Sequence, residues 1–224
     1  MGDPEYGAES TIIDAAGSTY HFRFDNNEDS TNQVIGLTLY NGKATGSNSS
    51  SAGGSVYIYE SNPVFKKVIF KQNKDEVDTW RGGGAVFIDN TSDVKFYQCV
   101  FDGNILDRTS TTDNKHANGG AVGIHRASAQ SSSYVLFDGC TFKNNVAKGS
   151  ERTAGGALDI YDSQAKILNS LFYNNTAHAS VDGQNNYGAY GSAISVSGPA
   201  YRSGNEETGG DVQIINCTIV NNKV

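Results

Sequence analysis

The sequence lacks the features on which several large classes of protein depend. Only 3 of its 224 residues are proline, and no apolar run approaches the length of a membrane span. The 17 basic residues are outnumbered by 24 acidic ones, so no basic stripe exists to neutralise phosphates. We therefore expect no nucleic-acid partner and no membrane span in this segment. The 26 glycines beside so few prolines indicate tight bends rather than linkers.

Cysteine and histidine are scarce as well. The three cysteines, Cys99, Cys140 and Cys217, cannot all pair within one chain, and no Cys-x-x-Cys spacing is present. The four histidines lie far apart in the sequence, so no Cys/His cluster of the zinc type is visible. The sequence thus predicts no metal site and no cofactor, apart from a structural calcium ion that is considered below.

Internal repetition, in contrast, is abundant. A motif of small residues, Gly-Gly-Ala or a close variant, occurs five times, and its middle residues are spaced by 30, 36, 36 and 36 positions. Glycine lets the chain turn with unusual φ, and the small residue that follows leaves room where coils crowd. The middle glycines are Gly54, Gly84, Gly120 and Gly156. We interpret this motif as architecture rather than catalysis.

A second motif, Phe-x-x-Asn, follows each copy of the first. At a sharp bend, an inward-facing asparagine can satisfy backbone groups and bond to the amide of the next coil. The copies begin at Phe70, Phe101, Phe142, Phe172 and Ile219, and they end at Asn73, Asn104, Asn145, Asn175 and Asn222.

Apolar residues between the motifs alternate with period two, which is typical of strands. Three short strands per repeat predict an all-β fold, a right-handed, three-faced parallel β-helix of about six to seven coils. The three cysteines share one position in the repeat, two residues before the aromatic residue, where Val68 and Ser170 also lie. A small inward side chain suits that position, so we expect buried thiols, with a bridge or a reactive site as the alternative.

The repeats also predict the domain organisation. We expect residues 1–10 to be a leader-derived or added segment, and residues 11–224 to form a single β-helix domain. The last repeat keeps its full apolar character up to Asn222, whereas a solenoid normally closes with an atypical polar cap. This predicts a fragment of a longer protein with further coils, or an open C-terminal coil that a second chain covers by self-association.

The paired motifs resemble a known family. Over about residues 34–224, the five Gly-Gly-Ala and Phe-x-x-Asn pairs are similar to the passenger region of the chlamydial polymorphic outer membrane proteins. Related coils occur in other bacterial surface proteins, which have endings similar to Asn-Cys-Thr-Ile-Val-Asn-Asn at residues 216–222. The resemblance implies an adhesin exposed at the bacterial outer membrane or secreted, which a C-terminal β-barrel of the parent protein translocates.

Candidate binding residues follow from the strand alternation. Side chains that alternate with the inward residues after the small motif should face outward as two exposed ladders. Aromatic faces beside carboxylates suit sugars, and Arg126 could neutralise a uronic acid. The residues predicted to bind a ligand are Tyr57, Tyr59, Asp89, His125, Arg126, Asp159 and Tyr161. Asp89, His125 and Asp159 would lie on successive coils and are weak candidates for acid–base catalysis. The alternative is an ordinary solvated sheet.

Acidic loops at residues 25–29, 75–78 and 206–207 offer oxygens for a structural calcium ion, although none has a known calcium-loop spacing. Solvated loop charge is the alternative.

The expected function is a non-enzymatic extracellular scaffold or adhesin that binds a host-cell or bacterial surface protein or a glycan. The second hypothesis is a polysaccharide-active or carbohydrate-binding β-helix.

Overall fold

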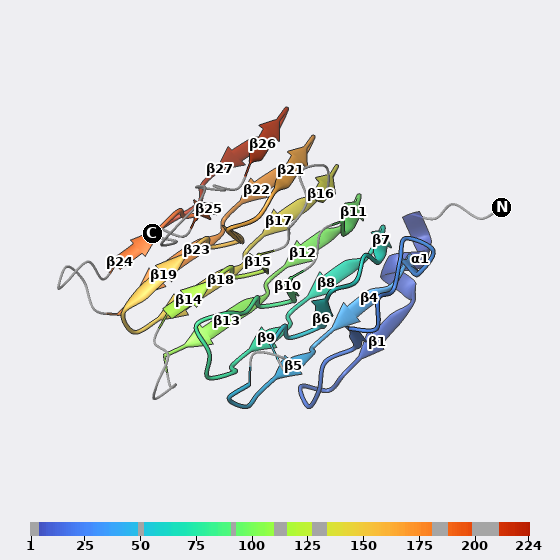
Figure 1. Cartoon of the computed structure of the whole chain (residues 1–224), viewed down its shortest axis with the longest axis horizontal. Coiled ribbons are helices and arrows are strands. Elements are labelled where there is room, and N and C mark those ends of the chain that lie inside the picture. Colours follow the sequence, from blue (N-terminus) through green and yellow to red (C-terminus); the bar gives the residue numbers. More distant parts are fainter. Residues whose placement is uncertain are drawn as a thin grey trace, which may run out of the picture.

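The chain folds into a parallel β-solenoid, in which strands far apart in the sequence lie side by side (Figure 1). The computed structural model describes residues 5–48, 52–90, 93–109, 116–126, 134–180, 188–198 and 211–224. All the strand pairs in this part of the chain are parallel, and the described strands form five sheets, which we name A to E. Among these residues, no helix is long and apolar enough to cross a membrane.

Sheets A, B and C surround the main hydrophobic core. Sheet A consists of β1 (Ile12–Asp14), β4 (Thr38–Tyr40), β8 (Ile69–Lys71), β12 (Val100–Asp102), β17 (Thr141–Lys143), β22 (Leu171–Tyr173) and β27 (Thr218–Val220). Sheet B consists of β2 (Phe22–Phe24), β6 (Val56–Tyr59), β10 (Val86–Asp89), β15 (Val122–His125), β20 (Leu158–Tyr161) and β25 (Ile194–Ser197). Sheet C consists of β3 (Gln33–Ile35), β7 (Val64–Lys66), β11 (Lys95–Tyr97), β16 (Val135–Asp138), β21 (Ala165–Leu168) and β26 (Val212–Ile215).

Two smaller sheets and one helix complete the described structure. Sheet D consists of β5 (Lys43–Ala44), β9 (Lys74–Asp75), β13 (Ile105–Arg108), β18 (Val146–Gly149) and β23 (Thr176–Ala179). Sheet E consists of β14 (His116–Asn118), β19 (Arg152–Ala154) and β24 (Gly188–Tyr190). The helix α1 (Glu5–Ser10) lies within residues 1–10, for which the sequence predicts a leader-derived or added segment, and it packs against β4. The sequence pattern does not predict sheets D and E.

The predicted number of six to seven coils is too high, because the structure supports about four turns. In sheets A, B and C, four turns have a neighbouring turn on both sides, and these turns begin at β6, β10, β15 and β20. The passes before and after them lie at the ends of the stack (Figure 1). Their inward apolar side chains are partly exposed as a result, for example Ile13, opposite Leu39, and Ile219, opposite Phe172.

Equivalent residues pair in register from turn to turn, and this produces ladders of identical side chains. Phe101 lies opposite both Phe70 and Phe142 in sheet A. The stacked ring centroids are 4.7 Å apart for Phe70 and Phe101, 4.6 Å for Phe101 and Phe142, and 4.4 Å for Phe142 and Phe172. All four rings are fully buried. The hydrophobic core is therefore a continuous column rather than a set of separate layers.

The asparagines of the Phe-x-x-Asn motif form a second column. The amide of Asn104 donates to the Asn145 side chain at 3.0 Å and to the Phe70 carbonyl at 2.9 Å. The bonds to the next asparagine continue at 2.9 Å from Asn145 and 2.8 Å from Asn175. The residue before each of these asparagines has a positive φ: Gln72, Gly103, Asn144, Asn174 and Asn221. Glycine and asparagine tolerate this conformation best, which explains why four of these five residues are Gly or Asn.

The middle glycines of the small motif are required by close packing between turns. A Cβ atom on Gly84 would overlap the carbonyl oxygen of Gly120, and one on Gly120 would overlap that of Gly156.

The cysteines lie on one ladder: Cys99 and Cys140 are buried, and Cys217 in the last turn is half-buried. Burial raises the pKa of the Cys140 thiol. The thiols of Cys99 and Cys140 point to backbone carbonyls of the preceding turn at 3.5 Å.

Candidate functional site

The outer face of sheet B, where the sequence predicted two exposed ladders, is largely covered. Tyr57, Asp89, His125 and Asp159 are each at most 6 % exposed, so the prediction that they face solvent was wrong. Residues 79–82, which we name the lid segment, pass over this face. The carbonyl of Gly82 lies so close to β15 that a side chain in place of Gly123 would overlap it.

A buried arginine holds the lid segment in place. Arg108, at the end of β13, is fully buried. Its guanidinium donates to the carbonyl of Thr79 at 2.8 Å and to that of Arg81 at 3.1 Å, on either side of Trp80. It also forms an ion pair with the buried Asp75 at 3.1 Å. Arg108 therefore positions Trp80 over sheet B.

Trp80 is the only tryptophan in the chain, and it covers a group of rings. Its ring meets that of His125 edge to face with the centroids 4.8 Å apart, and that of Tyr161 at 5.9 Å. His125 and Tyr161 stack on each other at 4.8 Å. The guanidinium of Arg81 lies 4.6 Å from the centre of the Trp80 ring. The ring group closes the site from the solvent side.

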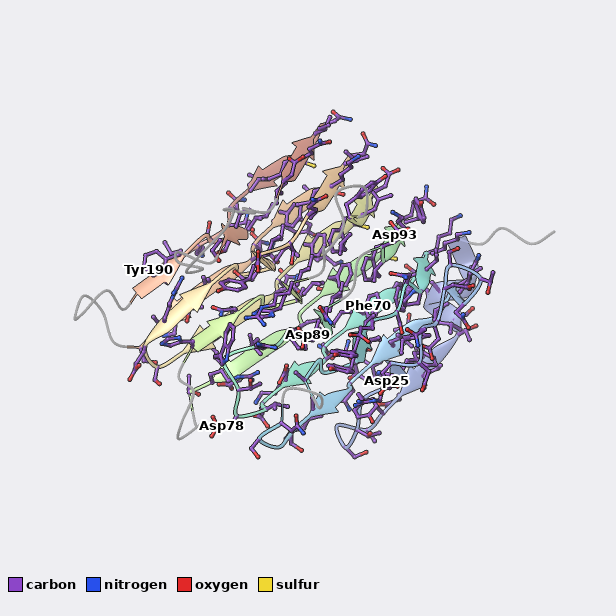
Figure 2. All side chains as sticks on the ribbon, in the orientation of Figure 1. Asp25, Phe70, Asp78, Asp89, Asp93 and Tyr190 are labelled. Atoms are coloured by element: carbon purple, nitrogen blue, oxygen red, sulfur yellow. The ribbon has the colours of Figure 1, made fainter. Side chains whose placement is uncertain are left out.

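Beneath this cover lies a carboxylate–imidazole pair. The Nδ1 atom of His125 is 3.3 Å from Oδ1 of Asp89, and Arg81 contacts the other carboxylate oxygen at 3.3 Å. Burial lowers the pKa of His125, although its hydrogen bond to Asp89 opposes the shift, while the charge of Arg81 adds to it. The imidazole is therefore neutral near pH 7. Figure 2 places Asp89 in the middle of the stack, away from both open ends.

Asp159 lies on the neighbouring strand β20, opposite Gly123. Burial raises its pKa to about 7, while a hydrogen bond to Ser195 and the charge of Arg152 act in the opposite direction. Asp159, His125, Trp80 and Tyr161 all line one cavity of about 20 Å³. This volume suits a single water molecule or ion and is far too small for a sugar ring.

The other predicted ligand residues lie at the margins of this site. Tyr59 is opposite Asp89 in the sheet register and is half-buried. Tyr57 lies under the guanidinium of Arg23, 4.7 Å from the ring centre. Burial raises the pKa of Tyr57 to about 12. Arg126 is exposed beyond the end of β15. The structure thus brings Asp89, His125, Asp159 and Tyr161 together, and it leaves Arg126 at the surface.

The acidic loops are engaged in other contacts. Asp75 is paired with Arg108, and Asp25 contacts Arg23 at 2.6 Å. Residues 206–207 lie outside the described part of the chain. Within the described part, no three His, Cys, Asp or Glu side chains gather as a metal site. These loops therefore give no support to a calcium site.

The sequence reasoning missed a groove on the outer face of sheet A. Its volume is about 560 Å³, and the helix α1 borders it through Glu9. The residues that line it are Glu9, Ile12, Thr38, Tyr40, Ile69, Lys71, Gln72, Val100, Asp102 and Lys143. The outward positions of β4, β8 and β12 carry Tyr40, Ile69 and Val100 beside the single lysine Lys71, a pattern visible in the sequence that could have indicated this surface.

The fold, together with these sites, defines the chain as an all-β parallel solenoid. Comparison of the chain with protein-family models, with curated proteins and with solved structures finds no match.

Proposed function

We propose that this chain is a non-enzymatic extracellular scaffold of the adhesin type, which binds a glycan or a surface protein of a host or bacterial cell. The observation that carries the proposal is the contrast between the two sites. The carboxylates and the imidazole lie under Trp80 around a cavity of about 20 Å³, where a polysaccharide cannot reach them. The groove on sheet A has about 560 Å³, within the usual range of ligand-binding clefts.

The chemistry of the groove favours a glycan as the ligand. Tyr40, Ile69 and Val100 provide an apolar floor, and such surfaces pack against the C–H faces of sugars. Lys71 and Gln72 provide hydrogen-bond donors, and Lys71 can also pair with the carboxylate of an acidic sugar. Lys143 contacts Asp102 at 3.3 Å and so contributes less net charge.

Binding without cleavage is the expected result when the full chain is applied to a panel of acidic and neutral polysaccharides. Tyr40→Ala and Lys71→Ala should each weaken binding at least about tenfold, the loss expected when one contact of about 1.4 kcal/mol is removed. Tyr97→Ala, on the outside of sheet C, is the matched control and should bind normally. Absence of binding to every glycan would contradict the proposal.

The same panel separates the two functional hypotheses. Depolymerisation of an acidic polysaccharide that is lost in Asp89→Asn would favour the polysaccharide-active alternative over a scaffold. Glycan binding that survives Tyr40→Ala and Lys71→Ala but is lost in Tyr97→Ala would move the site to another face. Product analysis by size-exclusion chromatography distinguishes binding from cleavage.

The proposal also covers the handedness of the solenoid, the number of its faces and its cellular location. We infer that the solenoid is right-handed, because parallel strands in one sheet are almost always joined by right-handed crossovers. We also infer that its cross-section has three faces, formed by sheets A, B and C. The resemblance to the chlamydial polymorphic outer membrane proteins supports an adhesin passenger at the bacterial surface or outside the cell.

The C-terminal edge of the stack supports self-association. Ile214, Ile215 and Val220 are 43–54 % exposed on the last strands of sheets C and A. Edge strands present unpaired backbone groups that pair readily with a second chain. Light scattering should show concentration-dependent dimers that Ile215→Lys abolishes. Ile35→Lys, an equally exposed change at the other end of sheet C, should leave the dimers intact, whereas a monomer at all concentrations would contradict this contact.

A further inference from the structure

The cavity beneath Trp80 collects buried polar atoms that have no hydrogen-bond partner. Among the described residues, three buried side-chain atoms lack one: Oδ1 of Asn118, Nε2 of His125 and Oδ1 of Asp159. All three residues line this one cavity. His125 is 4 % exposed and Asp159 is 6 % exposed. Buried polar atoms are normally paired, so three on residues that line one cavity indicate an occupant.

The hydrogen bonds around the cavity determine the chemical role of each atom. A carboxylate can only accept, so the 3.3 Å contact with Asp89 assigns the ring proton of His125 to Nδ1 and leaves a lone pair on Nε2. The amide nitrogen of Asn118 donates to the carbonyl of Trp80 at 3.3 Å, which turns its oxygen toward the cavity. An ionised Asp159 also accepts. With Asp159 ionised, the cavity is lined by three acceptors, and none of these three atoms is a donor.

A positively charged occupant fits three acceptors better than water does. One water molecule offers two protons and leaves one acceptor unsatisfied in a buried place. A cation, in contrast, can accept a lone pair from each of the three atoms. The mixture of one imidazole nitrogen with two oxygens suits a divalent first-row transition metal better than calcium or magnesium, which prefer oxygen ligands alone.

We propose that this cavity binds one divalent transition-metal ion through His125 Nε2, Asp159 Oδ1 and Asn118 Oδ1. Metal-binding histidines usually donate their other ring N–H to a carboxylate, and Asp89 occupies that position for His125. Arg81 does not oppose the ion with a free charge, because it pairs with Asp89 and stacks on Trp80. The amide oxygen of Asn118 adds a third ligand to those from His125 and Asp159. The cavity of about 20 Å³ has room for an ion but not for an organic ligand.

Calorimetric titration of the chelator-treated full chain with Zn²⁺ tests the site. We expect one equivalent to bind, with affinity reduced at least tenfold in His125→Gln and Asp159→Asn. Asp89→Asn, which only disturbs the orientation of His125, should lose about 10- to 100-fold. His178→Gln removes an exposed imidazole on β23 and is the matched control, which should bind normally. All proteins should carry Cys217→Ser, so that the half-buried thiol cannot ligate the metal.

Fluorescence gives a second measurement that needs no change at the ligands. Trp80 is the only tryptophan and its ring contacts His125, so Co²⁺ in the cavity should quench its emission with a single saturable transition. Zn²⁺ should compete with this quenching. Absence of binding for both metals would overturn the proposal and indicate that the cavity holds only water. Binding that persists unchanged in His125→Gln and Asp159→Asn would overturn it as well.

Discussion

Replacing Phe142 by alanine should lower the free energy of unfolding by about 3–5 kcal/mol, the usual cost of removing a buried aromatic ring. Phe142 is fully buried in β17, and its ring is stacked between Phe101 at 4.6 Å and Phe172 at 4.4 Å. Both stacks are lost with the ring. The turns on either side are held at a fixed spacing by the hydrogen bonds of sheet A, so the cavity cannot collapse.

Urea unfolding followed by circular dichroism measures this loss. Lys143→Ala changes the next residue on the same strand, whose side chain points outward, and it should stay within about 0.5 kcal/mol of the unmodified protein. An unchanged urea midpoint for Phe142→Ala, or equal losses in the two variants, would show that the Phe ladder does not carry the core.

Replacing Arg108 by methionine should cost about 3–5 kcal/mol, because it leaves the buried carboxylate of Asp75 without its ion-pair partner. It also removes the donors that hold the carbonyls of Thr79 and Arg81. The lid segment should then loosen, and the emission of Trp80, already 38 % exposed, should shift to longer wavelength as more of the ring enters water. The stability and the fluorescence therefore report two consequences of one substitution.

The control for Arg108→Met is Arg152→Met, an exposed arginine on β19, which should change stability by less than about 0.5 kcal/mol. The double variant Asp75→Asn with Arg108→Met should be more stable than Arg108→Met alone, because no buried charge is then left unpaired. A Trp80 spectrum that is unchanged in Arg108→Met would contradict the role of Arg108 in positioning the lid segment.

The column structure of the core was predictable because it depends on local pattern alone. Each coil repeats the same inward residues, so Phe101 meets Phe70 and Phe142 wherever the strands pair in register. The amide column follows in the same way from the regular place of Asn104 and Asn145 after the aromatic residues. Because the motifs repeat, a contact between residues far apart in the sequence can be predicted from the pattern within one repeat.

The alternation of inward and outward residues along the strands could not predict that the candidate ligand residues are buried. Strand periodicity separates the two faces of sheet B correctly, but it does not say what lies on the outer face. The cover comes from Trp80, which meets His125 across 45 sequence positions, and from the carbonyl of Gly82 against Gly123. The lid segment has no strand pattern and no repeat of its own, so its path was invisible in the sequence.

The sequence by itself determined the parallel solenoid, the aromatic and amide ladders and the position of the cysteines, because each of these repeats with the coil. Only the tertiary structure decided the number of complete turns, the closure of the Asp89–His125–Asp159 site and the groove on sheet A. These features depend on single, unrepeated residues such as Arg108 and Trp80, whose partners are chosen by packing in three dimensions rather than by spacing along the chain.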